Sequence, residues 1–173
     1  MSFFVENFAK FKELNALNHY DMSFTYEELY NKILTIKKEI QTQIPSKSVV
    51  AILGDYSFEN IALFFALYEN KNIIVPITSQ VKNVQDVYIE ESFTEFVVHF
   101  QDSNLHIAHI KNSTKHDMLQ TLQEKNQAGL VLFSSGSTGK PKAMIHNLDT
   151  LMDSYKDKRP KAMNMLVFLM FDH

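Results

Sequence analysis

Nine consecutive residues, from Ser134 to Lys142, combine the chemical groups that bind phosphate. They carry four hydroxyls, two glycines, two lysines and one proline, in the order Ser134, Ser135, Gly136, Ser137, Thr138, Gly139, Lys140, Pro141, Lys142. Glycine permits φ > 0 and lets a ligand approach the backbone closely, and successive backbone N–H groups in turns form anion-binding concavities. The hydroxyls add hydrogen-bond donors and the lysines add positive charge. We interpret this segment, the phosphate loop, as a binding element for the phosphates of a nucleotide.

The spacing of the phosphate loop differs from that of the common P-loop. That motif has four residues between its glycines and a Ser or Thr after its lysine. Here two residues separate Gly136 from Gly139, and Pro141 follows Lys140. Pro141 disfavours helical backbone at the residue before it, so we do not expect the loop to continue directly into a helix. A polar surface loop between two strands is the simpler alternative, because clusters of Ser, Gly and Thr commonly form such loops.

The phosphate loop and three other segments resemble motifs of the adenylate-forming superfamily. This superfamily contains acyl-CoA synthetases, adenylation domains of peptide synthetases and luciferases. Residues 24–29 resemble its first signature, residues 67–77 its second, and residues 166–173 the start of its fourth, in the family order. Ala143 departs from the pattern, since glycine is usual there. The resemblance implies that residues 1–173 are the N-terminal part of an AMP-binding (adenylation) domain whose C-terminal domain is absent.

The resemblance also implies an activity, that of an ATP-dependent ligase joining a carboxylic acid to coenzyme A or another thiol. Such enzymes convert the acid to an acyl adenylate, releasing pyrophosphate. In this family the phosphate loop would hold the β- and γ-phosphates of ATP with Mg²⁺. His173 matches a histidine that many acyl- and aryl-CoA synthetases carry near the substrate carboxylate; a strand-end histidine without a catalytic role is the alternative. Phe171 and Asp172 also resemble the amino-acid-activating branch, which leaves an amino-acid-activating adenylation domain open.

The chain stops at His173, directly after an apolar run. In the family, the adenine and ribose contacts, the magnesium carboxylate and the catalytic lysine lie further along, so we expect this fragment alone to be inactive. Two other interpretations stay open. One is a non-catalytic nucleotide-binding module that keeps the loop, and the other is a phosphotransferase with an atypical loop.

Composition limits the partners of the chain. The 45% hydrophobic and 21% charged fractions are typical of a globular domain, and a net charge of −3 provides no basic face for nucleic acid. The absence of cysteine excludes disulfides and thiolate metal sites. We find no signal peptide and no apolar run long enough to span a membrane, so we expect a cytoplasmic protein. A metal site at His106, His109 and His116 is conceivable, but the first two would point to opposite faces of a strand.

Helical and strand-like patterns alternate along the chain. We expect helices over residues 3–17, from Thr25 to before Pro45, over 58–68, 81–91 and 115–125, and from Asn147. We expect strands over 49–53, 73–77, 96–100, 105–110, 130–133 and 143–145, and a last one from Met165. This alternation predicts an α/β fold with a layered, mostly parallel sheet flanked by helices.

Overall fold

A six-stranded mixed sheet forms the centre of the computed structural model, which describes residues 1–110, 116–134, 141–158, 165–167 and 171. The strand order is β6-β5-β3-β4-β7-β8. The four inner strands are parallel, β5 (Phe96–Gln101), β3 (Val49–Leu53), β4 (Ile73–Ile77) and β7 (Gly129–Ser134). The edge strands β6 (Asn104–His109) and β8 (Lys142–Asn147) run antiparallel to their neighbours. The α/β fold class and the mostly parallel sheet are therefore confirmed.

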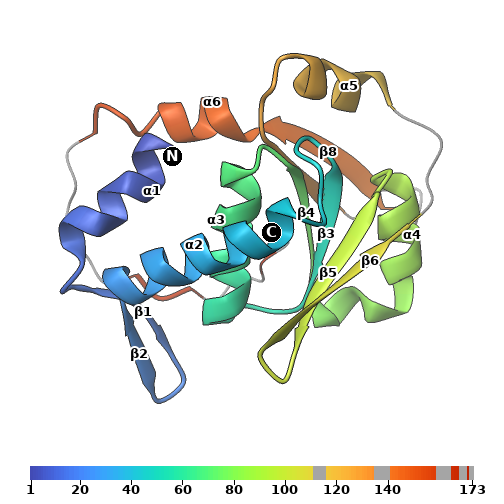
Figure 1. The fold of residues 1–173 in the computed structure, drawn as a ribbon. Coiled ribbons are helices and arrows are strands. Elements are labelled where there is room, and N and C mark those ends of the chain that lie inside the picture. The colour runs from blue at the N-terminus through green and yellow to red at the C-terminus, as the bar shows by residue number, and fades with distance from the viewer. Residues whose placement is uncertain (111–115, 135–140, 159–164, 168–170, 172–173) are drawn as a thin grey trace.

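Helices cover both faces of this sheet (Figure 1). One face packs against α1 (Phe3–Phe8), α2 (Tyr26–Gln41), α3 (Phe58–Glu69) and α6 (Leu148–Asp153), which together enclose the larger apolar core. The other face packs against α4 (Gln85–Glu91), which follows the 3₁₀ segment η2 (Ser79–Val84), and against α5 (Asp117–Glu124). The layers match the expectation for helices flanking a sheet.

The two central strands, β3 and β4, are predicted to the residue. Residues 49–52 and 73–77 are buried, because parallel strands covered on both faces are continuous apolar runs rather than alternating ones. Gly54 closes β3 with φ +144°, in the region that favours glycine. The amide of Gly54 donates to the Ile77 carbonyl at 3.0 Å, which ties the carboxyl ends of β3 and β4 together.

Helix α2 begins at the capping box that the sequence predicts. The Thr25 hydroxyl accepts a hydrogen bond from the Glu28 amide at 3.2 Å, and the Thr25 amide donates to the Glu28 carboxylate at 2.7 Å. These bonds satisfy backbone groups that would otherwise lack partners in the first turn. Leu29, Ile33, Ile36 and Ile40 form the buried stripe of the helix, as expected.

The expectation of one helix over residues 3–17 is wrong. Helix α1 ends at Phe8, a 3₁₀ turn η1 (Ala9–Phe11) follows, and β1 (Asn15–His19) then pairs antiparallel with β2 (Met22–Thr25). Asparagine and histidine are weak helix formers, and Leu17 and Phe24 pack onto the larger core through this hairpin instead. In Figure 1 the β1–β2 hairpin projects from the helical layer.

Two smaller corrections concern the ends of other elements. The expected helix over 81–91 begins as the 3₁₀ segment η2 and becomes α-helical only at Gln85. The expected strand from Met165 is wrong at its start, since Met165, Leu166 and Val167 are exposed and lie in no strand. The rest of that prediction falls on residues 168–170, 172 and 173, which lie outside the described part of the chain.

Candidate functional site

The β7–β8 hairpin holds the two ends of the phosphate loop. Its register pairs Gly129 with Asn147 at the base and Ser134 with Lys142 at the tip. The loop therefore joins two antiparallel neighbours, and the helix that would follow a common P-loop is replaced by strand β8. This agrees with the expectation, drawn from Pro141, that the loop does not run directly into a helix.

Strand β7 places the phosphate loop at the carboxyl edge of the parallel strands. Its first residues pair in parallel with β4, Gly129 opposite Ile73 and Leu130 opposite Ile74. In open α/β sheets, ligands bind in the crevice beyond the carboxyl ends of the strands. A loop at this edge is consequently in the position where the fold class binds ligands.

Polar groups link the neighbouring strands along the same edge. Asp55, just after β3 and Gly54, accepts a hydrogen bond from the Ser79 amide at 2.9 Å and another from the Ser79 hydroxyl. Ser79 lies two residues after the end of β4. Both residues are missed by the sequence analysis, although each follows a buried apolar run, which is the signal that could have found them.

Aromatic packing fixes the end of β7 beside the loop. Phe133 is buried and stacks on Tyr88 of α4, with ring centroids 4.0 Å apart and an interplanar angle of 22°. The base of the strand packs equally closely, because a Cβ added at Gly129 would lie 2.8 Å from the Leu122 side chain and 3.1 Å from Ile73. Strand β7 is therefore held at both ends by buried contacts.

The structure describes only the ends of the predicted phosphate site. Ser134 and Pro141 are half-buried and Lys142 is exposed. The residues between them, Ser135, Gly136, Ser137, Thr138, Gly139 and Lys140, lie outside the described residues, and so does the candidate catalytic residue His173. The predictions for these residues remain predictions.

A cavity of about 650 Å³ adjoins the second end of the loop. It lies on the α4 and α5 face of the hairpin, and its lining is mainly apolar, with Phe93, Leu119 and Val131 among the contributors. The polar residues of the same lining are Glu91, Ser92, His116 and Lys142. Lys142, the last residue of the phosphate loop, therefore borders a mainly apolar cavity.

Phe171 connects the last described part of the chain to the carboxyl edge. Its ring lies 4.9 Å from that of Tyr56, which follows β3, and 5.7 Å from that of Phe64 on α3. Phe171 itself therefore lies near the carboxyl end of β3.

The histidines considered for a metal site do not assemble as one. Among the described residues, no group of three or more His, Asp or Glu side chains could hold a metal ion. The Nδ1 atom of His116 accepts a hydrogen bond from the Met118 amide at 3.2 Å and caps α5. The ring of His109 lies 4.8 Å from that of Phe96 in a tilted arrangement, whereas His106 stacks on His99.

No protein-family model matches the chain, but known proteins resemble it in sequence and in fold. A mycosubtilin synthase polypeptide of Bacillus subtilis is 27% identical over 154 residues, which span 82% of this chain and 6% of the synthase polypeptide. The N-terminal subdomain of Klebsiella oxytoca NpsA, solved with 3-hydroxyanthranilyl-AMSN, superposes with a TM-score of 0.63 at 19% identity, covering 83% of this chain and 39% of that one. NpsA has also been solved in an artificially fused adenylation–PCP di-domain with ThdA. VinN in complex with 3-methylaspartate gives a TM-score of 0.64 at 14% identity, with 88% and 48% coverage.

These comparisons confirm the resemblance to the adenylate-forming superfamily at the level of the fold. The chain has the α/β architecture of the N-terminal subdomain of adenylation domains, and it spans well under half the length of the first structures that it matches. Within the described residues, no helix has the length and apolar character needed to cross a membrane.

Proposed function

We propose that this chain is the N-terminal part of an adenylation domain, residues 1–173, and that its phosphate loop binds the β- and γ-phosphates of ATP. The observation that carries the proposal is the β7–β8 hairpin, which opposes Ser134 to Lys142 at the carboxyl edge of the parallel sheet. The sequence between these residues supplies hydroxyls, two glycines and a second lysine. An α/β sheet and a loop of this chemistry at its ligand-binding edge fit nucleotide binding.

The reaction that fits this arrangement is activation of a carboxylic acid as an acyl adenylate. The acid's carboxylate attacks the α-phosphate of ATP, the bond to the β-phosphate breaks, and pyrophosphate leaves with the electron pair. Negative charge grows on the leaving group, so fixed donors and cations near the β- and γ-phosphates lower the barrier. We assign that role to Lys140 and Lys142, and we assign hydrogen bonding of the phosphate oxygens to Ser137 and Thr138.

Mg²⁺ is compatible with this loop as a partner of the nucleotide. Mg²⁺ keeps several waters and takes its remaining ligands from phosphates and one or two carboxylates. Ser134, at the described end of the loop, offers a hydroxyl oxygen, and no acidic cluster is needed when the phosphates supply most of the charge. When bound, the ion would neutralise phosphate charge.

The acid and the acyl acceptor define two variants of the proposal. The first is an acid–thiol ligase using coenzyme A, with His173 near the substrate carboxylate. The second is an amino-acid-activating adenylation domain, with Asp172 near the substrate amine. The similarity to VinN, which was solved with 3-methylaspartate, supports the second, whereas NpsA was solved with the aryl-acid derivative 3-hydroxybenzoyl-AMSN. In either variant we propose a small-molecule carboxylic acid as substrate and a cytoplasmic location.

Exchange of labelled pyrophosphate into ATP tests the proposal in the longer protein that carries this chain. Exchange that requires an added carboxylic acid supports adenylate formation, and comparing amino acids with carboxylic acids that lack an amine separates the two variants. ATP-dependent phosphorylation of an acceptor without such exchange would favour a phosphotransferase. Nucleotide binding without any turnover would favour the non-catalytic module.

A further inference from the structure

We infer that His99 and His106 form a two-histidine binding site for a divalent transition metal, with Cu²⁺ as the tightest ligand. The site lies on the β5–β6 ribbon, at the opposite edge of the sheet from the β7–β8 hairpin. It is therefore separate from the phosphate loop, and the inference does not depend on the proposed function.

The register of the ribbon makes the two histidines direct neighbours. His99 is opposite His106 in the antiparallel pair, and their rings lie 5.1 Å apart between centroids with an interplanar angle of 13°. Directly opposed residues have Cβ atoms roughly 4.5–5.5 Å apart. Histidine nitrogens bind metals such as zinc at about 2.0–2.1 Å, so two coordinating nitrogens need a separation near 3 Å. The stacked rings hold their nitrogen lone pairs in nearly parallel planes, so coordination requires at least one ring to rotate about its χ1 or χ2 bond, which the strands allow while they keep their register.

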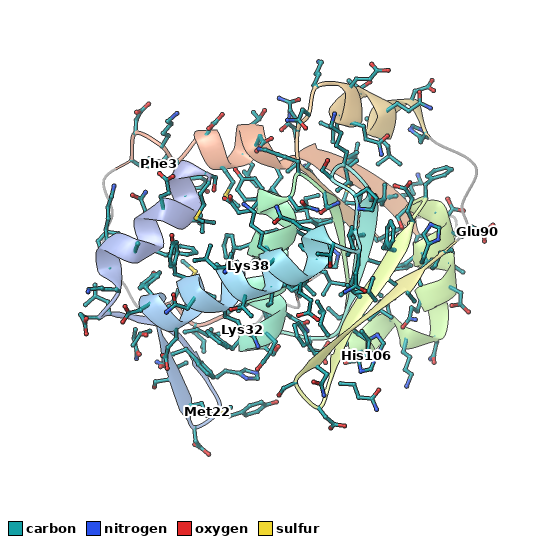
Figure 2. All side chains as sticks on the ribbon, viewed as in Figure 1. Phe3, Met22, Lys32, Lys38, Glu90 and His106 are labelled. Carbon is teal, nitrogen blue, oxygen red and sulfur yellow. The ribbon has the colours of Figure 1, made fainter. Side chains whose placement is uncertain are left out.

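Their surroundings leave the pair open to a hydrated ion. His99 is half-buried and His106 is exposed, and Figure 2 shows His106 on the β5–β6 ribbon, apart from the labelled lysines of α2. The neighbouring positions Phe100 and Val98 instead belong to the larger core on the other face. Water can supply the remaining ligands. The pair therefore suits an ion that keeps several water ligands, rather than a structural metal ion whose ligands all come from the protein.

The donor chemistry selects the class of metal. Imidazole nitrogen suits copper, nickel and zinc, and affinities of such sites rise toward Cu²⁺ in the first-row series. Mg²⁺ prefers oxygen ligands in octahedral geometry, so the pair does not compete for the ion that accompanies ATP. The site is a candidate for metal binding at the outer edge of the domain.

Titration of the 173-residue chain with Cu²⁺, followed by calorimetry and electron paramagnetic resonance, tests the inference. We expect one tight copper per chain, with a spectrum that reports coordination by two imidazole nitrogens. His99→Gln and His106→Gln should each weaken this binding at least ~10-fold, since each leaves one imidazole. His109→Gln is the matched control, because His109 lies on the same strand as His106 but opposite Phe96 rather than His99. The copper affinity of this variant should stay within about twofold of wild type.

Copper binding that weakens no more in His99→Gln and His106→Gln than in His109→Gln would overturn the inference, because the ion would then lie elsewhere. A spectrum with a single coordinating nitrogen would overturn it as well. Circular dichroism of each variant without metal checks the fold. Should either glutamine variant unfold, His99→Asn and His106→Asn provide the same loss of imidazole with a shorter side chain.

Discussion

The two central strands, β3 and β4, and the β7–β8 hairpin at one side of the sheet differ in how deeply their residues are buried. Strands β3 and β4 are buried almost throughout. In contrast, β7 alternates buried and half-buried residues, and β8 begins with three exposed residues, Lys142, Ala143 and Met144. Apolar burial thus concentrates in the centre, while the proposed phosphate loop begins and ends at the tip of a hairpin. Substitutions in the two regions should therefore separate loss of stability from loss of activity.

The largest effect on stability is expected at the sheet centre. Ile74 of β4 has no exposed surface and belongs to the larger core. Ile74→Ala removes buried methyl groups and leaves a cavity, which costs about 2–5 kcal/mol of unfolding free energy. Met144 of β8, which is 43% exposed, provides the control. Met144→Ala should change the unfolding free energy by no more than about 0.5 kcal/mol in the same denaturant titration.

At the junction of the two regions, Gly129 connects the hairpin to β4. A Cβ there would lie 2.8 Å from a terminal methyl of Leu122 and 3.1 Å from two atoms of Ile73. Gly129→Ala should therefore cost about 1–3 kcal/mol through overpacking. Gly129→Ala combined with Leu122→Ala should recover part of this loss relative to the sum of the single variants. Purely additive effects in thermal unfolding would show that the Leu122 contact is not the cause.

The ion pair between Lys71 and Asp149 fastens the segment after the hairpin to the sheet centre. Lys71 Nζ lies 2.8 Å from Asp149 Oδ1, and the Ala128 amide donates to Asp149 Oδ2 at 3.0 Å. Burial, with a smaller effect of Asp149, raises the pKa of the neighbouring Tyr68. Asp149→Ala leaves the amide without this acceptor, which costs about 1–3 kcal/mol.

Asp149→Asn separates the hydrogen bond from the charge. The amide variant keeps one acceptor oxygen, which can serve Ala128, while it loses the negative charge and the second acceptor oxygen, so it should be less destabilised than Asp149→Ala at neutral pH. Equal losses of unfolding free energy in the two variants would assign the effect to the Lys71 pair instead.

A smaller loss of stability is expected at the start of α2, far along the chain from the hairpin. Thr25→Ala removes the cap of this helix and costs about 1 kcal/mol. Hydrogen bonds from the Thr25 amide and hydroxyl lower the pKa of Glu28 below its usual 4.5. A lowered pKa stabilises the fold above the unfolded-state value and stops doing so as pH falls through the folded-state value.

The effect of Thr25→Ala should consequently be pH-dependent. The difference in unfolding free energy between wild type and variant is expected to be constant near neutral pH and to shrink below about pH 4.5. A difference that stays constant through this acidic range would contradict the assigned role of the Glu28 carboxylate.

The sequence predicts the centre of the sheet better than it predicts the hairpins and the pairing of the outer strands. The limits of β3 and β4 are correct to the residue because continuous apolar runs bounded by turns define them. The β1–β2 hairpin is missed because its few apolar residues also fit a helical spacing, and only packing against the core decides between the two. The register that opposes His99 to His106 depends on strand pairing, which local patterns do not encode.

For the candidate site, the sequence predicts the chemistry and the structure adds its placement. The hydroxyls, glycines and lysines of the phosphate loop are visible as a motif, and the proline within it predicts that no helix follows directly. The stacking of Tyr88 on Phe133 and the link between Asp55 and Ser79 join residues distant in sequence. Such contacts appear only once the strand order is known.

The central claim, that the β7–β8 hairpin presents an ATP phosphate site, is tested most directly with Lys142→Ala in the longer protein that carries this chain. Lys142 is exposed, so its removal should leave the unfolding free energy nearly unchanged. Acid-dependent pyrophosphate exchange should fall roughly 100-fold, the loss typical of one transition-state donor, while acid binding changes little. Exchange at the wild-type rate in the folded variant would contradict the claim.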